Sequence, residues 1–313
     1  MTNLSEFTFL SSDGKTQLHG MLWEPEGVAV HAVLQICHGV AEHIARYDGF
    51  ARALNEQGIV VAGHDHLGHG KSLPEGGTPV YFGDGNTWNT VVDDIYVLHQ
   101  RLKQRYPDVP LCIMGHSMGS FLTRTYLIRY PGTVKAAVIM GTGWQPRAAI
   151  TGGLAPAPAI AAVSGENATS ELVTELAFGS YNKLFAPNRT KVDWLSADES
   201  NVDDYIADPL CGADATVGLF RQMLHGIRFN QRQSHLRQMD REMPVLFVAG
   251  DKDPVGNCGK GVRQTYDAFR AAGMRDCTLK LYPGLRHEIL NEKAYTADIT
   301  KNIEAWLLSR LEK

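Results

Sequence analysis

Short apolar runs without polar alternation recur along the chain and predict strands covered on both faces. The clearest runs lie at His31–Cys37, Ile59–Gly63, Leu111–Met114, Val134–Met140, Pro244–Gly250 and Thr278–Tyr282. Between them, apolar residues at helical spacing predict helices at about 46–57, Thr87–Arg105, Ser120–Arg129, Lys260–Ala272 and Tyr295–Leu311. This alternation favours a mostly parallel sheet with helices on both faces.

The amino-terminal segment shows a different pattern. Two strand-like runs, Phe7–Leu10 and Gln17–Trp23, flank a polar stretch that contains Asp13-Gly14. An Asp-Gly dipeptide between strand-like runs favours a tight turn, so we expect a β-hairpin here.

The alternation stops after Met140 and resumes near residue 241. The intervening segment contains no buried-strand run, and its helix-like pieces are Glu171–Phe178, Val202–Ile206 and Thr216–Phe229. A loop of about 100 residues without structure of its own is uncommon in a compact α/β domain. We therefore expect a core of residues 1–140 and 241–313, with residues 141–240 inserted after the sixth strand as a mainly helical subdomain.

Composition narrows the class of protein. Of the 313 residues, 44% are hydrophobic and 20% are charged, which is ordinary for a soluble globular protein. The net charge of −4 provides neither a basic surface for nucleic acid nor a cationic face for an anionic membrane. The amino terminus lacks the features of a signal peptide, and no apolar run approaches the length of a membrane span.

The five cysteines are scattered and form no C-x-x-C pair. This pattern favours a reducing cytosol over a disulfide framework or a zinc site, so we expect a cytoplasmic protein.

The sequence Gly115-His116-Ser117-Met118-Gly119 directly follows the apolar run at Leu111–Met114 and precedes a helix-like segment. Strand, sharp turn and helix in this order place Ser117 at the apex of the turn, where its hydroxyl is presented as a nucleophile. A side chain at either glycine would crowd the turn. The motif alone also fits a glycine-rich turn with an incidental serine, so a base, an acid and oxyanion donors are required elsewhere.

Loops at the carboxyl ends of parallel strands converge on one crevice. Asp251 and Asp253 follow the strand-like run at Pro244–Gly250, and His287 follows the run at Thr278–Tyr282. With Ser117 they give the chain order Ser, Asp, His, which is that of α/β-hydrolases.

Two backbone N–H groups could bind the oxyanion. Met118 stands at the start of the helix after the nucleophile, and His38-Gly39-Val40 follows the third strand-like run. Gly39 lets the backbone approach a substrate, so we expect the Val40 and Met118 N–H groups to form the oxyanion hole.

Together these motifs make the chain resemble the α/β-hydrolases of the monoacylglycerol lipase and lysophospholipase group, of serine aminopeptidase S33 type, which also includes carboxylesterases. The matching segments span about residues 32–290 and are His38–His43 with Arg46-Tyr47, Asp65–Ser72, Gly115–Gly119, Gly250–Asp253 and His287. The resemblance implies the α/β-hydrolase fold, Asp253 rather than Asp251 as the acid, and a cap over the active site at 141–240. The chain departs from the group at Ala41, where some relatives have Gly, and at His66, where Arg is usual.

The resemblance also implies the reaction. Ser117, activated by His287 and Asp253, would cleave a carboxylic ester of a small acyl lipid through an acyl-enzyme, without cofactor or metal. Transient contact with a membrane surface through the cap follows from the same resemblance. The residues expected to contact substrate are His38, Gly39, His116, Leu154, Ile160, Phe178 and Leu184. Other apolar residues of the insertion could line an acyl tunnel or form the core of the cap: Val163, Leu172, Leu176, Tyr181 and Phe185.

Other functions remain open at this point. An aminopeptidase, a thioesterase or an acyltransferase could use the same triad, and a peptidase would need a buried acid for the free amine, with Glu171, Glu175 and Asp193 available. A non-catalytic ligand-binding protein of this fold is a further alternative, against which the intact triad argues.

His64-x-His66-x-x-His69 nearly spells the zinc signature of the metallo-β-lactamase fold. Gly68 stands where that signature needs Asp, so we expect no metal at these histidines.

Overall fold

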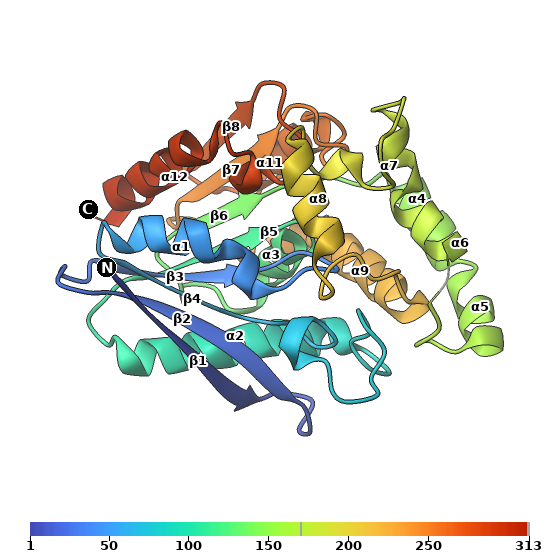
Figure 1. Ribbon diagram of the computed structural model, residues 1–313, viewed down its shortest axis with the longest axis horizontal. Coiled ribbons are helices and arrows are strands. Elements are labelled where there is room, and N and C mark those ends of the chain that lie inside the picture. The colour runs from blue at the N-terminus through green and yellow to red at the C-terminus, as the bar shows by residue number, and fades with distance from the viewer. Residues whose placement is uncertain (170, 312–313) are drawn as a thin grey trace.

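In the computed structural model, which describes residues 1–169 and 171–311, an eight-stranded sheet runs in the order β1-β2-β4-β3-β5-β6-β7-β8 (Figure 1). The strands are β1 (Thr2–Leu10), β2 (Gln17–Pro25), β3 (Ala32–Cys37), β4 (Ile59–His64), β5 (Leu111–His116), β6 (Ala137–Met140), β7 (Val245–Gly250) and β8 (Cys277–Tyr282). Strands β3 to β8 pair in parallel, and this confirms the predicted mostly parallel sheet.

The amino-terminal hairpin is also confirmed. β1 pairs with β2 antiparallel, in a register that joins Leu10 to Gln17, and β2 pairs antiparallel with β4. β1 begins earlier than the apolar pattern indicated because most of its residues are exposed at the edge of the sheet.

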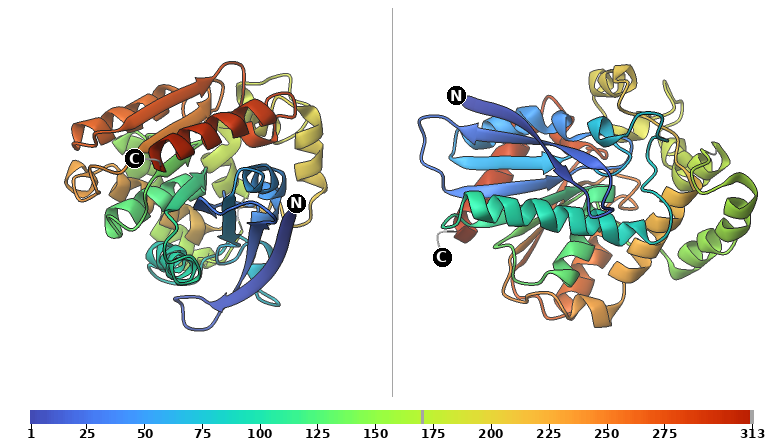
Figure 2. Two further views of the ribbon diagram at one scale, coloured as in Figure 1. Left: turned by 90° about the vertical axis from the view of Figure 1, so that its left-hand side faces the viewer. Right: turned by 90° about the horizontal axis from the view of Figure 1, so that it is seen from below.

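Helices cover both faces of the sheet (Figure 2). On one face, α1 (Asp48–Asn55) and α12 (Thr296–Leu311) bury Phe50, Leu54 and Ile303 against the strands. On the other face, α2 (Thr87–Arg105), α3 (Met118–Arg129) and α11 (Lys260–Ala271) bury a second apolar cluster. Burial of these two clusters provides the main driving force for the fold.

The described residues of the segment between β6 and β7 form helices joined by loops, and this segment is called the insertion below. Its helices are α4 (Arg147–Leu154), α5 (Ala157–Ser164), α6 (Glu171–Thr174), α7 (Ser180–Lys183), α8 (Glu199–Ala207), α9 (Val217–Asn230) and α10 (Gln233–Leu236). Between α6 and α7 the chain forms a wide helical turn at Glu175–Gly179. Helices α4 to α7 lie beyond the carboxyl ends of the strands, at the right of Figure 1, whereas α8 stands nearer the middle of that view and α9 packs against α2 and α3. Across residues 1–169 and 171–311, every helix is too short or too polar to cross a membrane.

Asp65, at the carboxyl end of β4, ties three segments together. Its carboxylate accepts hydrogen bonds from His19 Nδ1 of β2 at 2.9 Å, from the Ile44 N–H at 2.8 Å and from the Lys71 N–H at 2.9 Å. Burial alone would raise the pKa of Asp65, but the hydrogen bonds from His19 and from the Ile44 and Lys71 N–H groups lower it to about 2.

Because the pKa of Asp65 is lower in the folded state than its ordinary 3.8, the carboxylate stabilises the fold above pH 4, and this stabilisation is lost as the pH falls toward 2. We expect Asp65→Asn to lower the free energy of unfolding by about 2 kcal/mol near pH 5. Urea titrations between pH 5 and pH 2 would measure this, and the two proteins should converge at the acidic end. A constant difference across that range would contradict the assignment.

Candidate active site

Ser117 occupies a strained turn between β5 and α3. Its φ of +54° is unusual for a residue with a side chain. A Cβ added to Gly115 would lie 2.3 Å from the carbonyl oxygen of Gly119, and one added to Gly119 would lie 2.0 Å from the carbonyl oxygen of Cys37. The two glycines therefore allow the tight turn and let the end of β3 approach the start of α3.

The structure brings the predicted acid and base together. His287 follows β8 and Asp253 follows β7, and Nδ1 of His287 lies 3.0 Å from Oδ1 of Asp253. Both side chains are buried, and the ring of Trp194 packs against the imidazole with its centroid 5.0 Å away. His287 and Ser117 line the same cavity. Because Nδ1 is bonded to the acid, Nε2 is the nitrogen left for the serine.

Asp251 contacts the loop after β8 instead of the imidazole of His287. Its Oδ1 accepts a hydrogen bond from the Gly284 N–H at 2.8 Å, so it fixes the loop after β8 rather than the imidazole.

The expected oxyanion donors flank the nucleophile. Val40 follows β3 through Gly39, Met118 is the first residue of α3, and both line a cavity together with Ser117. Within residues 1–169 and 171–311, neither N–H donates a hydrogen bond. Free N–H groups at the start of a helix are suited to a developing negative charge.

A buried carboxylate, Glu42, supports the segment His38-Gly39-Val40, which we call the oxyanion loop. Its Oε1 accepts hydrogen bonds from the Gly39 N–H at 2.5 Å and from the Tyr47 hydroxyl at 3.0 Å, and it lies 3.2 Å from Nδ1 of His116. Its Oε2 accepts from Arg46 at 3.0 Å. Burial raises the pKa of Glu42, but its hydrogen bond with His116 and the charges of His116 and Arg46 hold it well below the usual range.

The Glu42 network extends to the loop of the base and to the insertion. Arg46 binds both oxygens of Glu288 at 2.7 and 2.8 Å, and Glu288 directly follows His287. Asn201 of α8 donates to Glu288 at 2.9 Å. The carbonyl oxygen of His287 lies 3.3 Å from Nε2 of His116, next to the nucleophile. One hydrogen-bonded network therefore connects the oxyanion loop, the nucleophile turn and the loop of the base.

His38 begins the oxyanion loop and does not line either cavity that meets Ser117. Its Nδ1 lies 2.7 Å from the Gly39 carbonyl oxygen, and its Nε2 accepts the His66 N–H at 3.0 Å. Burial lowers the pKa of His38, so it is a neutral structural residue.

His64, His66 and His69 are buried and pack among aromatic rings below the loop. Burial lowers the pKa of His64 and of His69 to about 3. In the described part of the chain, their nitrogens do not form a group close enough to share one ion.

Two cavities meet at Ser117 and share Val40, Phe178 and Trp194. The larger, of about 480 Å³, carries polar side chains on its insertion side, namely Asn182, Lys183, Asn188 and Lys191. The smaller, of about 150 Å³, is lined mainly by apolar side chains besides Ser117 and Gln145, and its wall includes Phe121, Ile150, Tyr181, Leu219, Phe220, Met223, Leu224 and Ile227. We call them the polar cavity and the apolar cavity.

The other residues expected to contact substrate are placed differently from one another. Phe178 lines both cavities, and Gly39 and His116 line the polar one. Leu154, Ile160 and Leu184 line neither, and Leu184 is 61% exposed. The side chains of Leu172 and Leu176 lie outside the described residues.

The α9 wall of the apolar cavity was not identified from the sequence. Phe220, Met223, Leu224 and Ile227 recur at i, i+3, i+4 and i+7, which marks an apolar helix face but not the surface that this face contacts. The role of Glu42 was missed in the same way, although Arg46 at i+4 was a signal for an ion pair.

The chain is similar to known hydrolases over its whole length. The family model described as serine aminopeptidase, S33, matches residues 29–294. The monoacylglycerol lipase of Mycolicibacterium smegmatis is 31% identical over 313 residues, with 98% of each chain covered, and the monoglyceride lipase of Mus musculus is 27% identical, with 96% of this chain and 90% of that protein covered. The structure of a thermostable carboxyl esterase from Bacillus coagulans in complex with glycerol superposes with a TM-score of 0.92 at 26% identity, covering 99% of this chain and 100% of that one.

We expect Glu42→Gln to slow the reaction of Ser117 with a fluorophosphonate by about tenfold to a hundredfold, because the Gly39 N–H and the oxyanion loop lose their anionic anchor. The rate of covalent labelling measures this. Glu24→Gln, which removes a surface ion pair with Arg105, is the matched control and should label at the rate of the unsubstituted protein. Equal labelling of both variants, with Glu42→Gln folded, would exclude the positioning role.

Proposed function

The chain belongs to the serine aminopeptidase S33 family and is a serine ester hydrolase, and from this premise we propose that it cleaves small acyl-lipid esters of the monoacylglycerol type at Ser117. The observation that carries the proposal is the meeting of two cavities at one hydroxyl, one lined mainly by apolar side chains and the other also lined by amide and ammonium groups. An ester with an apolar acyl chain and a polar alcohol has the same division at its scissile bond.

The proposed mechanism uses the groups around Ser117. His287 takes the hydroxyl proton as Ser117 attacks the ester carbonyl, while Asp253 orients the imidazole and stabilises its cation. The Val40 and Met118 N–H groups bind the oxyanion, and the loss of one such donor typically costs about 10²–10³ in rate. His287 then protonates the leaving alcohol, and a water molecule activated by the same histidine releases the acid.

The acyl chain is assigned to the apolar cavity. With a volume of about 150 Å³, this cavity has room for apolar atoms of the acyl chain next to Ser117. The alcohol is assigned to the polar cavity, where Asn182 and Lys183 offer hydrogen-bond donors.

Because the insertion contributes to the walls of both cavities, we propose that residues 141–240 act as a cap over the active site.

The peptidase alternative finds less support. Asp193 is buried, but its carboxylate accepts hydrogen bonds from the N–H groups of Arg189 and Thr190 within its own loop. Glu175 lines the polar cavity, but its side chain is 59% exposed. The side chain of Glu171 lies outside the described residues. A buried acid aimed at a free amine is therefore not found among these candidates.

The proposal also includes contact with a lipid surface and a cellular location. Large apolar side chains are exposed on the insertion, among them Val163 at 88% and Leu184 at 61%, and they suit transient contact with a lipid surface. The five cysteines are free thiols, which supports the proposed cytoplasmic location.

Fluorophosphonate labelling tests the nucleophile. We expect rapid labelling of the unsubstituted protein and none of Ser117→Ala, whose melting temperature should change little because only one hydroxyl is removed. The same variant should lose ester hydrolysis by a factor of at least about 10³. Labelling that persists in Ser117→Ala would place the nucleophile elsewhere.

The two cavities predict a dependence on acyl chain length. Met223→Trp fills the apolar cavity, so we expect the ratio of octanoate to acetate hydrolysis, as kcat/KM for p-nitrophenyl esters, to fall at least about tenfold. Met223→Leu, which conserves volume, should keep the ratio. An unchanged ratio in Met223→Trp would remove the acyl chain from this cavity, and faster turnover of aminoacyl amides than of glycerol monoesters would favour the peptidase.

A further inference from the structure

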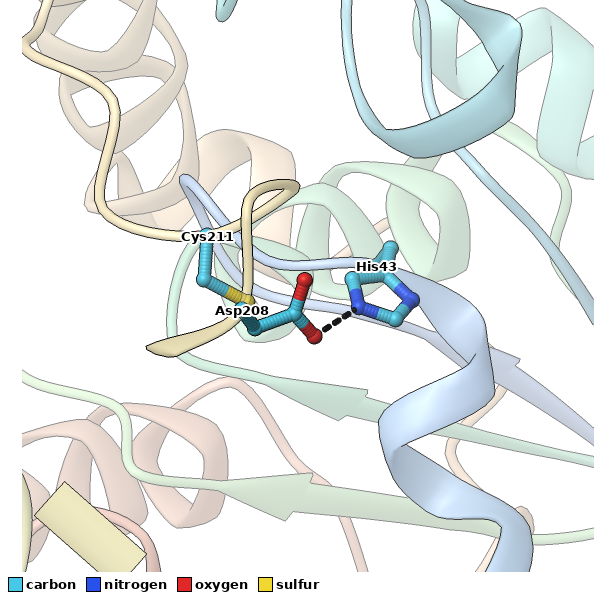
Figure 3. Close-up of side chains that lie close together, drawn as sticks. All are labelled: His43, Asp208 and Cys211. Atoms are coloured by element: carbon cyan, nitrogen blue, oxygen red, sulfur yellow. Dashed lines mark hydrogen bonds and ion pairs between the residues drawn. The ribbon is translucent and has the colours of Figure 1, made fainter. Parts of the chain in front are cut away.

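Three side chains with metal-binding atoms lie together outside the catalytic cavities (Figure 3). His43 follows the oxyanion loop, whereas Asp208 and Cys211 belong to the turn after α8 in the insertion. One ligand atom from each lies within 4.8 Å of the others, and Nε2 of His43 is 2.7 Å from Oδ2 of Asp208. Residues more than 160 positions apart in the chain thus form one compact cluster.

The three side chains supply ligand types that are characteristic of zinc sites. An imidazole nitrogen, a carboxylate oxygen and a thiolate sulfur are the three ligand types that zinc uses in proteins, and three protein ligands leave a fourth position for water. We propose that His43, Asp208 and Cys211 bind a divalent transition-metal ion of the zinc class. The site is accessible, because 11% of the His43 side chain and 29% of the Asp208 side chain are exposed.

Ligation requires a defined set of proton changes. The Cys211 thiol forms a bond to the metal and releases its proton to solvent. Nε2 of His43 presents its lone pair, so the ring proton resides on Nδ1. The Asp208 carboxylate exchanges its contact with His43 for a bond to the ion. Zinc in proteins binds such nitrogen, oxygen and sulfur atoms at about 2.0–2.3 Å.

The cluster lies where the insertion meets the oxyanion loop. The Gly212 N–H and the Tyr205 hydroxyl, both in the insertion, each donate to the Ala41 carbonyl oxygen at 3.0 Å. A metal ion at the cluster would add a bond between the same two segments and restrain the insertion against the oxyanion loop. We expect bound metal to lower kcat, because it would hinder the movement of a cap over the active site. This expectation rests on the proposed function.

Cobalt(II) is the direct probe of the site. Titration of the metal-free protein with Co²⁺ should give the charge-transfer absorption of a cobalt thiolate at one equivalent. Cys211→Ser should lose this absorption and bind at least about tenfold more weakly. Cys258→Ser removes an exposed thiol outside the cluster and should behave as the unsubstituted protein. Absence of the thiolate absorption, or its persistence in Cys211→Ser, would overturn the proposal and leave His43 and Asp208 as a structural pair.

A second measurement separates the site from its effect. Zn²⁺ should lower kcat of the unsubstituted protein and of Cys258→Ser, but not of Cys211→Ser, and a chelator should restore the rate. It should also raise the melting temperature of the proteins that retain Cys211. Cobalt binding with an unchanged kcat would overturn the restraint of the insertion. Absence of ester hydrolysis in the metal-free protein would contradict the proposed function and leave the cobalt result standing.

Discussion

The active site depends on one buried negative charge. The Glu42 carboxylate is withdrawn from water, and a charge in that position is tolerated only with close partners. Its partners come from the oxyanion loop, from Arg46 and Tyr47, and from His116 beside the nucleophile. Removing one member of such a group leaves a buried charge uncompensated, which costs about 3–5 kcal/mol in comparable cases. The loop proposed to bind the oxyanion is therefore held by the same carboxylate that contacts His116, the residue before Ser117.

The sheet supplies the remaining constraint. β3, β5, β7 and β8 are parallel, so the segments that carry Val40, Ser117, Asp253 and His287 all leave the sheet at one edge. Gly119 allows α3 to approach the end of β3, and Val40 and Met118 line one cavity together with Ser117. Rigid strands and a satisfied polar network keep the groups in place before substrate arrives, which is the condition for electrostatic stabilisation of a transition state.

The sequence is informative where local rules apply. Helix α2 has the bounds expected from its apolar spacing, and the segments with Ser117, Asp253 and His287 lie where strand ends predict them. Local rules do not predict which surface a helix face contacts, because tertiary packing determines it. An apolar face on α9 is visible in the sequence, but only packing against α3 and Tyr181 makes it the wall of a cavity. Leu184 has the residue type of a lining position, yet it points to solvent, because hydrophobicity alone does not specify which side of a short helix is covered.

We propose that the acyl group and the oxyanion each have a defined place around Ser117. A crystal structure of the protein with an octyl phosphonate bonded to Ser117 tests it most directly. We expect the phosphonyl oxygen to lie within hydrogen-bond distance of the Val40 and Met118 N–H groups, and the alkyl chain to lie between α9 and Phe121. An alkyl chain among Asn182, Lys183 and Asn188, or a phosphonyl oxygen away from both N–H groups, would contradict it.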